Sequence, residues 1–362
     1  MSCIRIAQYG TKHGHAAGKL LALRNSPRVE LAGVYEPDPE RRRELADAGG
    51  PYAGVRWYET ADELLGDPTV VAVASEGRND ESLAQTEQIV LAGKHVWYDK
   101  PAGDDWARWQ RVVALAEERG LVLQMGYMFR YHEGFRRIAA WARSGLLGTI
   151  YAVRAHMSTC IPAEAQRVIA VHRGGIFYDL AGHMIDQIVW LLGRPERVTA
   201  FLRSDGGAVP GFSDNTLGVL EYPGALAYVD IAAMEAPPPA RRFEVYGRVG
   251  SAIMEPFEPA GAIRLCLAED RGGFRAGEQL VERLLGLVEL SFGAGHLQLQ
   301  VASLQAGEHS ALGHRVAAGH QLVGQCLADP GSGTRDDRSC HQPSLPIRKL
   351  SGTHSTFPTL TR

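Results

Sequence analysis

Short apolar runs alternate with helical patterns over the first 130 residues of the chain. Runs rich in β-branched residues and bounded by glycine or proline predict buried strands at 3–9, 29–35, 55–58, 70–74, 95–98 and 121–125. Between them, segments with apolar residues at helical spacing predict helices at 15–24, 39–48, 61–65, 82–92 and 106–119. Strands joined by mostly helical connections indicate a doubly wound parallel sheet, ordered 3-2-1-4-5-6, in an α/β domain spanning residues 1–126.

A different pattern begins after residue 148, where strand-like runs are short and separated by tight turns. The runs lie at 150–158, 198–203, 216–222, 225–232, 242–246, 251–255 and 263–268. Pro223-Gly224 joins two of them, as in a hairpin. With helices expected at 135–144 and 179–192, these runs predict an α+β domain over residues 127–290, with a largely antiparallel open sheet.

Residues 291–362 have an unusual composition. All 6 Trp and 12 Tyr of the chain precede this segment, which is rich in Ser, Gln, Thr and Gly. Its histidines lack the spacing of metal ligands, and little sustained amphipathic period is visible. We therefore expect an atypical, partly disordered tail.

Charge and cysteine content narrow the class of protein. The formal net charge of −3 gives no electrostatic reason to bind nucleic acid or an anionic membrane. No apolar run approaches the roughly 18–20 residues of a transmembrane helix, and an apolar strand begins at Cys3, which leaves no room for a signal peptide. The cysteines form no CxxC pair, so we expect neither a disulfide framework nor a metal site. We expect a cytoplasmic protein with a small-molecule substrate.

Ligands of a doubly wound sheet bind at the carboxyl ends of its strands, near the point where the strand order reverses. The first strand ends in a glycine turn that matches the dinucleotide fingerprint G-x-G-x-x-G only in part, because Lys12 and His15 stand at its second and third glycine positions. The helix that follows still offers N–H groups and a positive dipole to a phosphate. A glycine turn that binds nothing is the alternative interpretation. Expected cofactor contacts are Gly10, Thr11, Lys12, His13, Gly14 and Ser75.

Glu36 ends the second predicted strand, roughly 20 residues beyond the glycine turn. A carboxylate at this position accepts hydrogen bonds from the ribose hydroxyls and repels a 2′-phosphate, which favours NAD over NADP. The nearby arginines at 41–43 argue the other way, although an exposed helix face explains them equally well.

Candidate catalytic residues follow the fifth predicted strand and open the helix at 179–192. Lys100, in Asp99-Lys100-Pro101, would also contact the nicotinamide end of the dinucleotide and suits hydrogen bonding to a substrate hydroxyl. Asp179 and His183 are four residues apart and therefore share one face of their helix. Such a pair orients an imidazole for proton transfer, and an ordinary surface pair is the alternative.

In combination, these motifs resemble the glucose–fructose oxidoreductase/inositol dehydrogenase (Gfo/Idh/MocA) family. The resemblance covers roughly residues 3–270 and rests on the turn at Gly10, on Ala92-Gly93-Lys94-His95-Val96 before Asp99-Lys100-Pro101, on the segment 126–131, and on Gly174-Gly175 followed by Asp179 and His183. It implies a Rossmann domain, with Lys100 as the lysine of the family's Glu-Lys-Pro motif. It also implies that Asp179 and His183 are the catalytic and substrate-binding pair, and that Tyr127 and Arg130 contact substrate. Asp99 in place of Glu, Lys12 in place of glycine and Arg173 in place of a third glycine depart from the family pattern.

The resemblance implies an NAD-dependent oxidoreductase that acts on a secondary alcohol of a sugar, cyclitol or related polyol. His183 would take the hydroxyl proton, Lys100 would bind the reacting oxygen and Asp179 would orient the site. Some family members use NAD for glycoside cleavage, so an NAD-dependent glycosidase is one alternative. An inactive dinucleotide-binding protein is the other. The family also implies a homo-oligomer formed through the second-domain sheet.

Overall fold

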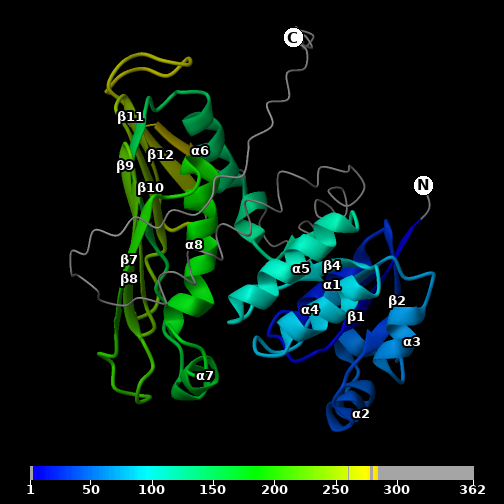
Figure 1. Ribbon diagram of the computed structural model, residues 1–362. Coiled ribbons are helices and arrows are strands. Elements are labelled where there is room, and N and C mark those ends of the chain that lie inside the picture. Colours follow the sequence, from blue (N-terminus) through cyan, green and yellow to red (C-terminus); the bar gives the residue numbers. More distant parts are fainter. Residues whose placement is uncertain (1–2, 260, 278–279, 284–362) are drawn as a thin grey trace, which may run out of the picture. The chain divides into compact units, whose positions relative to one another are not determined.

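The computed structural model describes residues 3–259, 261–277 and 280–283. Within them, a parallel sheet is followed by a mostly antiparallel one, which confirms the predicted fold class (Figure 1). The tail predicted at 291–362 lies outside the described residues, as does 284–290 of the predicted second domain. Among the described helices, none is long and apolar enough to cross a membrane.

The first sheet has the strand order β2-β1-β3-β4-β5, and all of its pairs are parallel. Its strands are β1 (Ile4–Tyr9), β2 (Val29–Tyr35), β3 (Ala72–Ser75), β4 (His95–Tyr98) and β5 (Leu123–Met125). The strand predicted at 55–58 and the six-stranded order that depended on it were wrong. Within this segment only Trp57 forms a β-bridge, to Val34 of β2. The extended stretch is short because Gly54, with φ of 67°, turns the chain just before it and Thr60 caps the next helix just after it.

Helices connect these strands as the apolar periodicity predicts. They are α1 (Ala16–Asn25), α2 (Pro39–Asp47), α3 (Ala61–Gly66), α4 (Ser82–Leu91) and α5 (Trp106–Glu118), with a short 3-10 helix η1 (Gly50–Tyr52). Asp38, Thr60 and Asp105 each cap a helix by accepting backbone N–H groups of its first turn. Tyr98 of β4 and Trp109 of α5 are buried together, with ring centroids 5.8 Å apart.

The second sheet has the strand order β13-β12-β11-β10-β6-β9-β8-β7. Its strands are β6 (Ile150–His156), β7 (Arg197–Arg203), β8 (Asn215–Tyr222), β9 (Ala225–Ala232), β10 (Arg242–Gly247), β11 (Gly250–Met254), β12 (Ala262–Leu267) and β13 (Leu280–Arg283). Among the described strand pairs of this second sheet, β6–β9 alone is parallel. A long connection through two helices and two strands separates β6 from β9, which allows the chain to return in the same direction. Pro223-Gly224 forms the predicted hairpin, with Tyr222 opposite Ala225.

Helix α8 covers one face of this sheet and carries the predicted Asp–His pair (Figure 1). The helices of this domain are η2 (Met128–Tyr131), α6 (Glu133–Arg143), α7 (Ala163–Ile169) and α8 (Ile176–Leu192). Helix α8 begins three residues earlier than predicted, directly after Gly175. This residue has φ of 54°, and a Cβ there would lie 2.4 Å from the carbonyl oxygen of Ser213, so only glycine fits. Helix α7 was not predicted, because it buries Gln166 rather than an apolar side.

Candidate active site

The glycine turn after β1 packs against the loop that follows β3. Gly10 has φ of 83°, and a Cβ on it would lie 2.7 Å from the backbone nitrogen of Gly77. The N–H of His13 donates to the carbonyl of Glu76 at 3.0 Å. The carboxyl ends of β1 and β3 are therefore joined at the place where a doubly wound sheet binds its ligand.

Thr11 links the glycine turn to Glu36 at the end of β2. Its hydroxyl donates to Glu36 Oε2 at 2.6 Å, and the Asp38 N–H donates to Glu36 Oε1 at 3.0 Å. Arg41 also lies here, since its Nε donates to Thr11 Oγ1 at 2.7 Å and its Nη2 to the Thr11 carbonyl at 2.8 Å. Glu36 is buried, and a carboxylate with two bonds made retains acceptor capacity for ribose hydroxyls.

The remaining predicted cofactor residues differ in what they contact. Lys12 Nζ lies 3.2 Å from Asp38 Oδ2 and 3.9 Å from Glu81 Oε1, so its side chain bridges two neighbouring loops. Space is open at Gly14, where an added Cβ would meet no atom within 4 Å. The hydroxyl of Ser75 is buried against α4, where it accepts from Thr86 Oγ1 at 3.1 Å.

These features fit a dinucleotide. The turn offers open space at Gly14, a carboxylate at the ribose position, and a helix that begins without a side-chain cap on its backbone N–H groups. Gly10, Thr11, Gly14 and Glu36 would hold the adenosine half, and Lys100 the nicotinamide half.

Lys100 and Asp179 come together, although 79 residues separate them in the chain. The Lys100 ammonium donates to the Asp179 carbonyl at 3.1 Å and lies 3.5 Å from Asp179 Oδ1. Lys100 follows β4 and is buried, whereas the Asp179 carboxylate is partly exposed in the first turn of α8. The ammonium therefore contacts the start of α8, one turn before His183.

His183 is buried, and its Nδ1 has no hydrogen-bond partner among the described residues. Its ring packs against Phe129 and Tyr127, with centroids 5.2 and 6.2 Å away. Burial, followed by the positive charge of Lys100, lowers the pKa of His183 well below its usual value. The imidazole is therefore neutral near pH 7, which is the form that accepts a proton.

Arg130, predicted to contact substrate, has a partner within the protein. Its Nε and Nη2 donate to Asp186 Oδ2 and Oδ1 at 2.8 and 2.6 Å, and both side chains are buried. The guanidinium also lies 5.8 Å from the Trp190 ring. The substrate role of Arg130 stays a prediction, but two of its donors are engaged by Asp186.

A buried charged cluster beside the glycine turn was not predicted from the sequence. Lys19 of α1 forms ion pairs with Glu76 and, at 2.9 Å, with Asp99 Oδ2. Burial by itself would raise the pKa of Asp99, but the charge of Lys19, the hydrogen bond from His15 and the nearby His13 together hold it well below the ordinary value. Burial raises the pKa of Glu76 to about 8. His13 and His15 join this cluster, and their H-x-H spacing is the one sequence signal that could have pointed to it.

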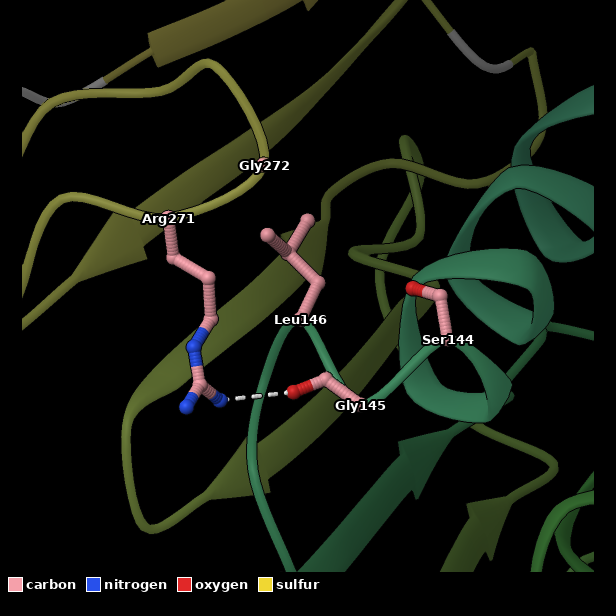
Figure 2. Close-up of a pocket in the computed structure, with 5 residues that line it drawn as sticks. All are labelled: Ser144, Gly145, Leu146, Arg271 and Gly272. Atoms are coloured by element: carbon pink, nitrogen blue, oxygen red, sulfur yellow. Dashed lines mark hydrogen bonds between the residues drawn. The ribbon is translucent and has the colours of Figure 1, made fainter.

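A surface pocket lies elsewhere in the second domain (Figure 2). It is lined by Ser144, Gly145, Leu146, Arg271 and Gly272, and Arg271 Nη1 donates to the Gly145 carbonyl at 2.9 Å. None of the predicted site residues lines it. The candidate active site is therefore the set of residues at the strand ends and on α8, and not this pocket.

The fold and the site define an NAD(P)-dependent oxidoreductase. Residues 4–127 match the profile described as "Oxidoreductase family, NAD-binding Rossmann fold", and residues 135–253 match the GFO/IDH/MocA C-terminal domain. The chain belongs to the Gfo/Idh/MocA family, as its motifs predicted.

Individual relatives support the same family. The chain is 27% identical over 247 residues to 1,5-anhydro-D-fructose reductase of Ensifer adhaerens, a match covering 66% of this chain and 73% of that protein. Two solved structures share the fold. GenD2 from gentamicin A biosynthesis, in complex with NAD, has a TM-score of 0.73 and 24% identity over 91% of this chain and 95% of its own. KijD10, a 3-ketoreductase from Actinomadura kijaniata in complex with NADP and TDP-benzene, has a TM-score of 0.70 and 21% identity over 90% and 96%.

Proposed function

We propose that this oxidoreductase transfers hydride between nicotinamide and a secondary alcohol of a sugar, cyclitol or related polyol. The observation that carries the proposal is the junction of Lys100 with α8, where Lys100 Nζ lies 3.1 Å from the Asp179 carbonyl and His183 follows one turn later. The substrate class is supported by the name of the Ensifer adhaerens relative, a reductase of an anhydro sugar.

The chemistry divides between the cofactor and the protein. When bound, the nicotinamide supplies the acceptor for hydride. His183, neutral because burial and Lys100 lower its pKa, accepts the hydroxyl proton. Lys100 donates a hydrogen bond to the reacting oxygen, and Asp179 holds the ammonium in place. Tyr127, against the His183 ring, restricts where the substrate lies.

We propose NAD as the preferred cofactor. The buried Glu36 carboxylate, held by Thr11 and the Asp38 N–H, would face a 2′-phosphate across a poorly hydrated gap, where repulsion is stronger than in water. The guanidinium of Arg41 argues for NADP, but it already donates twice to Thr11, whose hydroxyl in turn donates to Glu36.

We also propose that two copies associate through the face of the second sheet opposite α8, which none of the described helices covers. Phe201 of β7 pairs with Leu217 of β8, Val219 of β8 pairs with Tyr228 of β9, and these side chains alternate with the residues that face α8. Phe201 is 54% exposed, and Leu226, on the same face, is 52% exposed. Apolar side chains gathered on one open face are typical of a subunit interface.

Turnover measurements test the enzymatic proposal. The full-length chain is incubated with NAD or NADP and a panel of polyols, and the absorbance of the reduced nicotinamide is followed. Accumulation of reduced cofactor with one of the polyols supports the proposal. Cleavage of an aryl glycoside without net reduction would support a glycosidase instead, and cofactor binding without any turnover would contradict both.

Substitutions then test the roles of the residues. Lys100→Met and His183→Asn should each lower kcat by about 10²–10⁴-fold and leave the NAD dissociation constant nearly unchanged, because neither side chain is expected to contact the adenosine half of the cofactor. Lys94→Met is the matched control. Lys94 is another buried lysine, and it donates to the carbonyls of Asp67 and Val70 at 2.7 and 2.8 Å. Its loss should lower stability but leave the kcat of the folded protein intact.

A further inference from the structure

Four side chains with metal-ligating atoms meet at the carboxyl ends of β1, β3 and β4. We propose that His13, His15, Glu76 and Asp99, here called the H-x-H site, bind a divalent transition-metal ion, with Zn²⁺ as the best match. The proposal does not rest on the oxidoreductase activity, and it revises the expectation from the sequence that the chain has no metal site.

The spacing of the donor atoms fits a tetrahedral ion. Ligand atoms that lie about 2.0–2.2 Å from a tetrahedral zinc ion are about 3.3–3.6 Å from one another. Asp99 Oδ2 lies 3.1 Å from His15 Nδ1 and 3.6 Å from His13 Nδ1, and Glu76 Oε2 lies 3.7 Å from His13 Nδ1. Donor atoms of His13, His15 and Asp99 all lie within 4.8 Å of one another. These three residues form the core of the site, and Glu76 approaches it from the side of His13.

An unpartnered carboxylate oxygen gives independent support. Glu76 is fully buried, and its Oε2 has no hydrogen-bond partner among the described residues. A buried polar atom without a partner is costly, and a bound cation would remove that cost. The orphaned oxygen is also the one nearest His13.

Lys19 is the main opposing charge. At Glu76 it pairs with the oxygen other than the one nearest His13, whereas at Asp99 it approaches Oδ2, the oxygen nearest the two histidines, so a bound ion and Lys19 would share that oxygen. Lys19 pairs with Oε1 of Glu76, which leaves Oε2 for the ion, and it lies 2.9 Å from Asp99 Oδ2. Hydrogen-bond donors behind ligating carboxylates are usual in zinc sites, where they fix the orientation of the ligand. With both carboxylates ionised, the ion and Lys19 together carry one more positive charge than their partners, so the site is nearly neutralised.

Nitrogen and carboxylate donors select the kind of ion. Imidazoles suit zinc and its neighbours in the first transition series, whereas Mg²⁺ and Ca²⁺ prefer oxygen alone. His13 Nδ1 accepts the backbone N–H of His15 at 3.1 Å, and coordination there would replace that bond.

Metal titration of the whole chain, stripped with a chelator and free of cofactor, tests the site. Zn²⁺ is added in a calorimeter, and Co²⁺ is added in parallel because tetrahedral Co²⁺ has a strong visible absorption. Other histidines of the chain, six of them within 291–362, can also bind zinc, so the result is read by comparison between variants. We expect the His13→Asn/His15→Asn protein to lose one equivalent of Zn²⁺ and the tetrahedral Co²⁺ band.

His156→Asn is the matched control. His156 also lies between carboxylates, Asp230 at 2.6 Å and Glu235 at 3.1 Å, but outside the H-x-H site, and its loss should leave the titration unchanged. If the double variant does not fold, His15→Asn alone is used, because the His15 side chain is 53% exposed, and we expect at least about tenfold weaker binding. Equal stoichiometry and affinity in wild type and the H-x-H variants, or a Co²⁺ spectrum without the tetrahedral band, would overturn the proposal.

Discussion

Replacing Asp186 by Ala should destabilise the protein strongly, because it leaves the Arg130 charge buried without its partner. Both nitrogens that Arg130 directs at Asp186 lie within 2.8 Å of a carboxylate oxygen. The Arg130 and Asp186 side chains are only 7% and 1% exposed, so water cannot take the place of the lost carboxylate. Burial raises the pKa of Asp186 while Arg130 opposes that rise, which indicates that the carboxylate depends on this guanidinium.

The expected loss follows from the general cost of breaking a buried ion pair. Removing one partner costs about 3–5 kcal/mol, whereas replacing both by apolar residues of similar volume is often close to neutral. With an unfolding entropy of about 2.1 cal/mol/K per residue, about 1 kcal/mol lowers the Tm of a 362-residue protein by about 1.3 °C, so Asp186→Ala should lower Tm by about 4–7 °C. The double variant Arg130→Met/Asp186→Leu should recover most of that loss.

Thermal unfolding of wild type, the single variants and the double variant measures these differences, and kcat/KM is measured on each folded protein. If the Arg130–Asp186 pair has a structural role, Arg130→Met should lower Tm, and the double variant should restore it with little change in kcat/KM. If Arg130→Met lowers kcat/KM at least tenfold while Tm stays within about 1 °C of wild type, Arg130 binds substrate as the family resemblance implied. The structural interpretation would then be refuted.

Three further predictions concern the cofactor, the assembly and the pH dependence of stability. Glu36→Gln should weaken the preference for NAD over NADP, which equilibrium titration of both cofactors measures, and tighter NADP binding by wild type would instead favour Arg41 as the determinant. Leu226→Glu, on the open sheet face, should shift the sedimentation coefficient from that of a dimer to that of a monomer, and an unchanged value would exclude this face. Because the pKa of His13 falls to about 4 in the folded protein, its contribution to stability is lost as the pH drops from about 6.5 to about 4. Urea unfolding of His13→Asn should be less sensitive to pH than wild type in that window, with Glu76 contributing in the opposite sense to both proteins.

Most of the fold was predictable because burial leaves a local trace in the sequence. The strands of the second sheet alternate between residues that face α8 and residues that do not, so 225–232 was predicted with the bounds that β9 has. The segment 55–58 has the same apolar content, yet its flanking Gly54 and Thr60 leave room for a single bridge to Val34. The apolar content of a segment indicates that it is buried, but it does not indicate how many hydrogen-bonded strand partners the segment has.

The residues of the candidate site could be predicted from the sequence only where the pattern lies within a single helix or directly after a single strand. Asp179 and His183 share a helix face, and Lys100 directly follows a strand, so local pattern was sufficient for them. Lys19 and Glu76 meet across 57 residues, and neither has a distinctive neighbour in sequence. Within α1, a lysine beside two leucines is typical of a solvated helix face, whereas here it is a buried counter-ion for two carboxylates.

Lys12, which departs from the dinucleotide fingerprint, contacts the loops beside the glycine turn. The second glycine of the fingerprint lets the backbone approach a pyrophosphate, and a side chain there would obstruct it if it pointed into the crevice. Among the described residues, Arg241 alone combines a side chain with positive φ, so Lys12 needs no glycine-like backbone. Its ammonium reaches Asp38 and Glu81, on loops to either side of the turn, and Gly14 keeps open space beside it. The lysine therefore ties the glycine turn to the loops that follow β2 and β3.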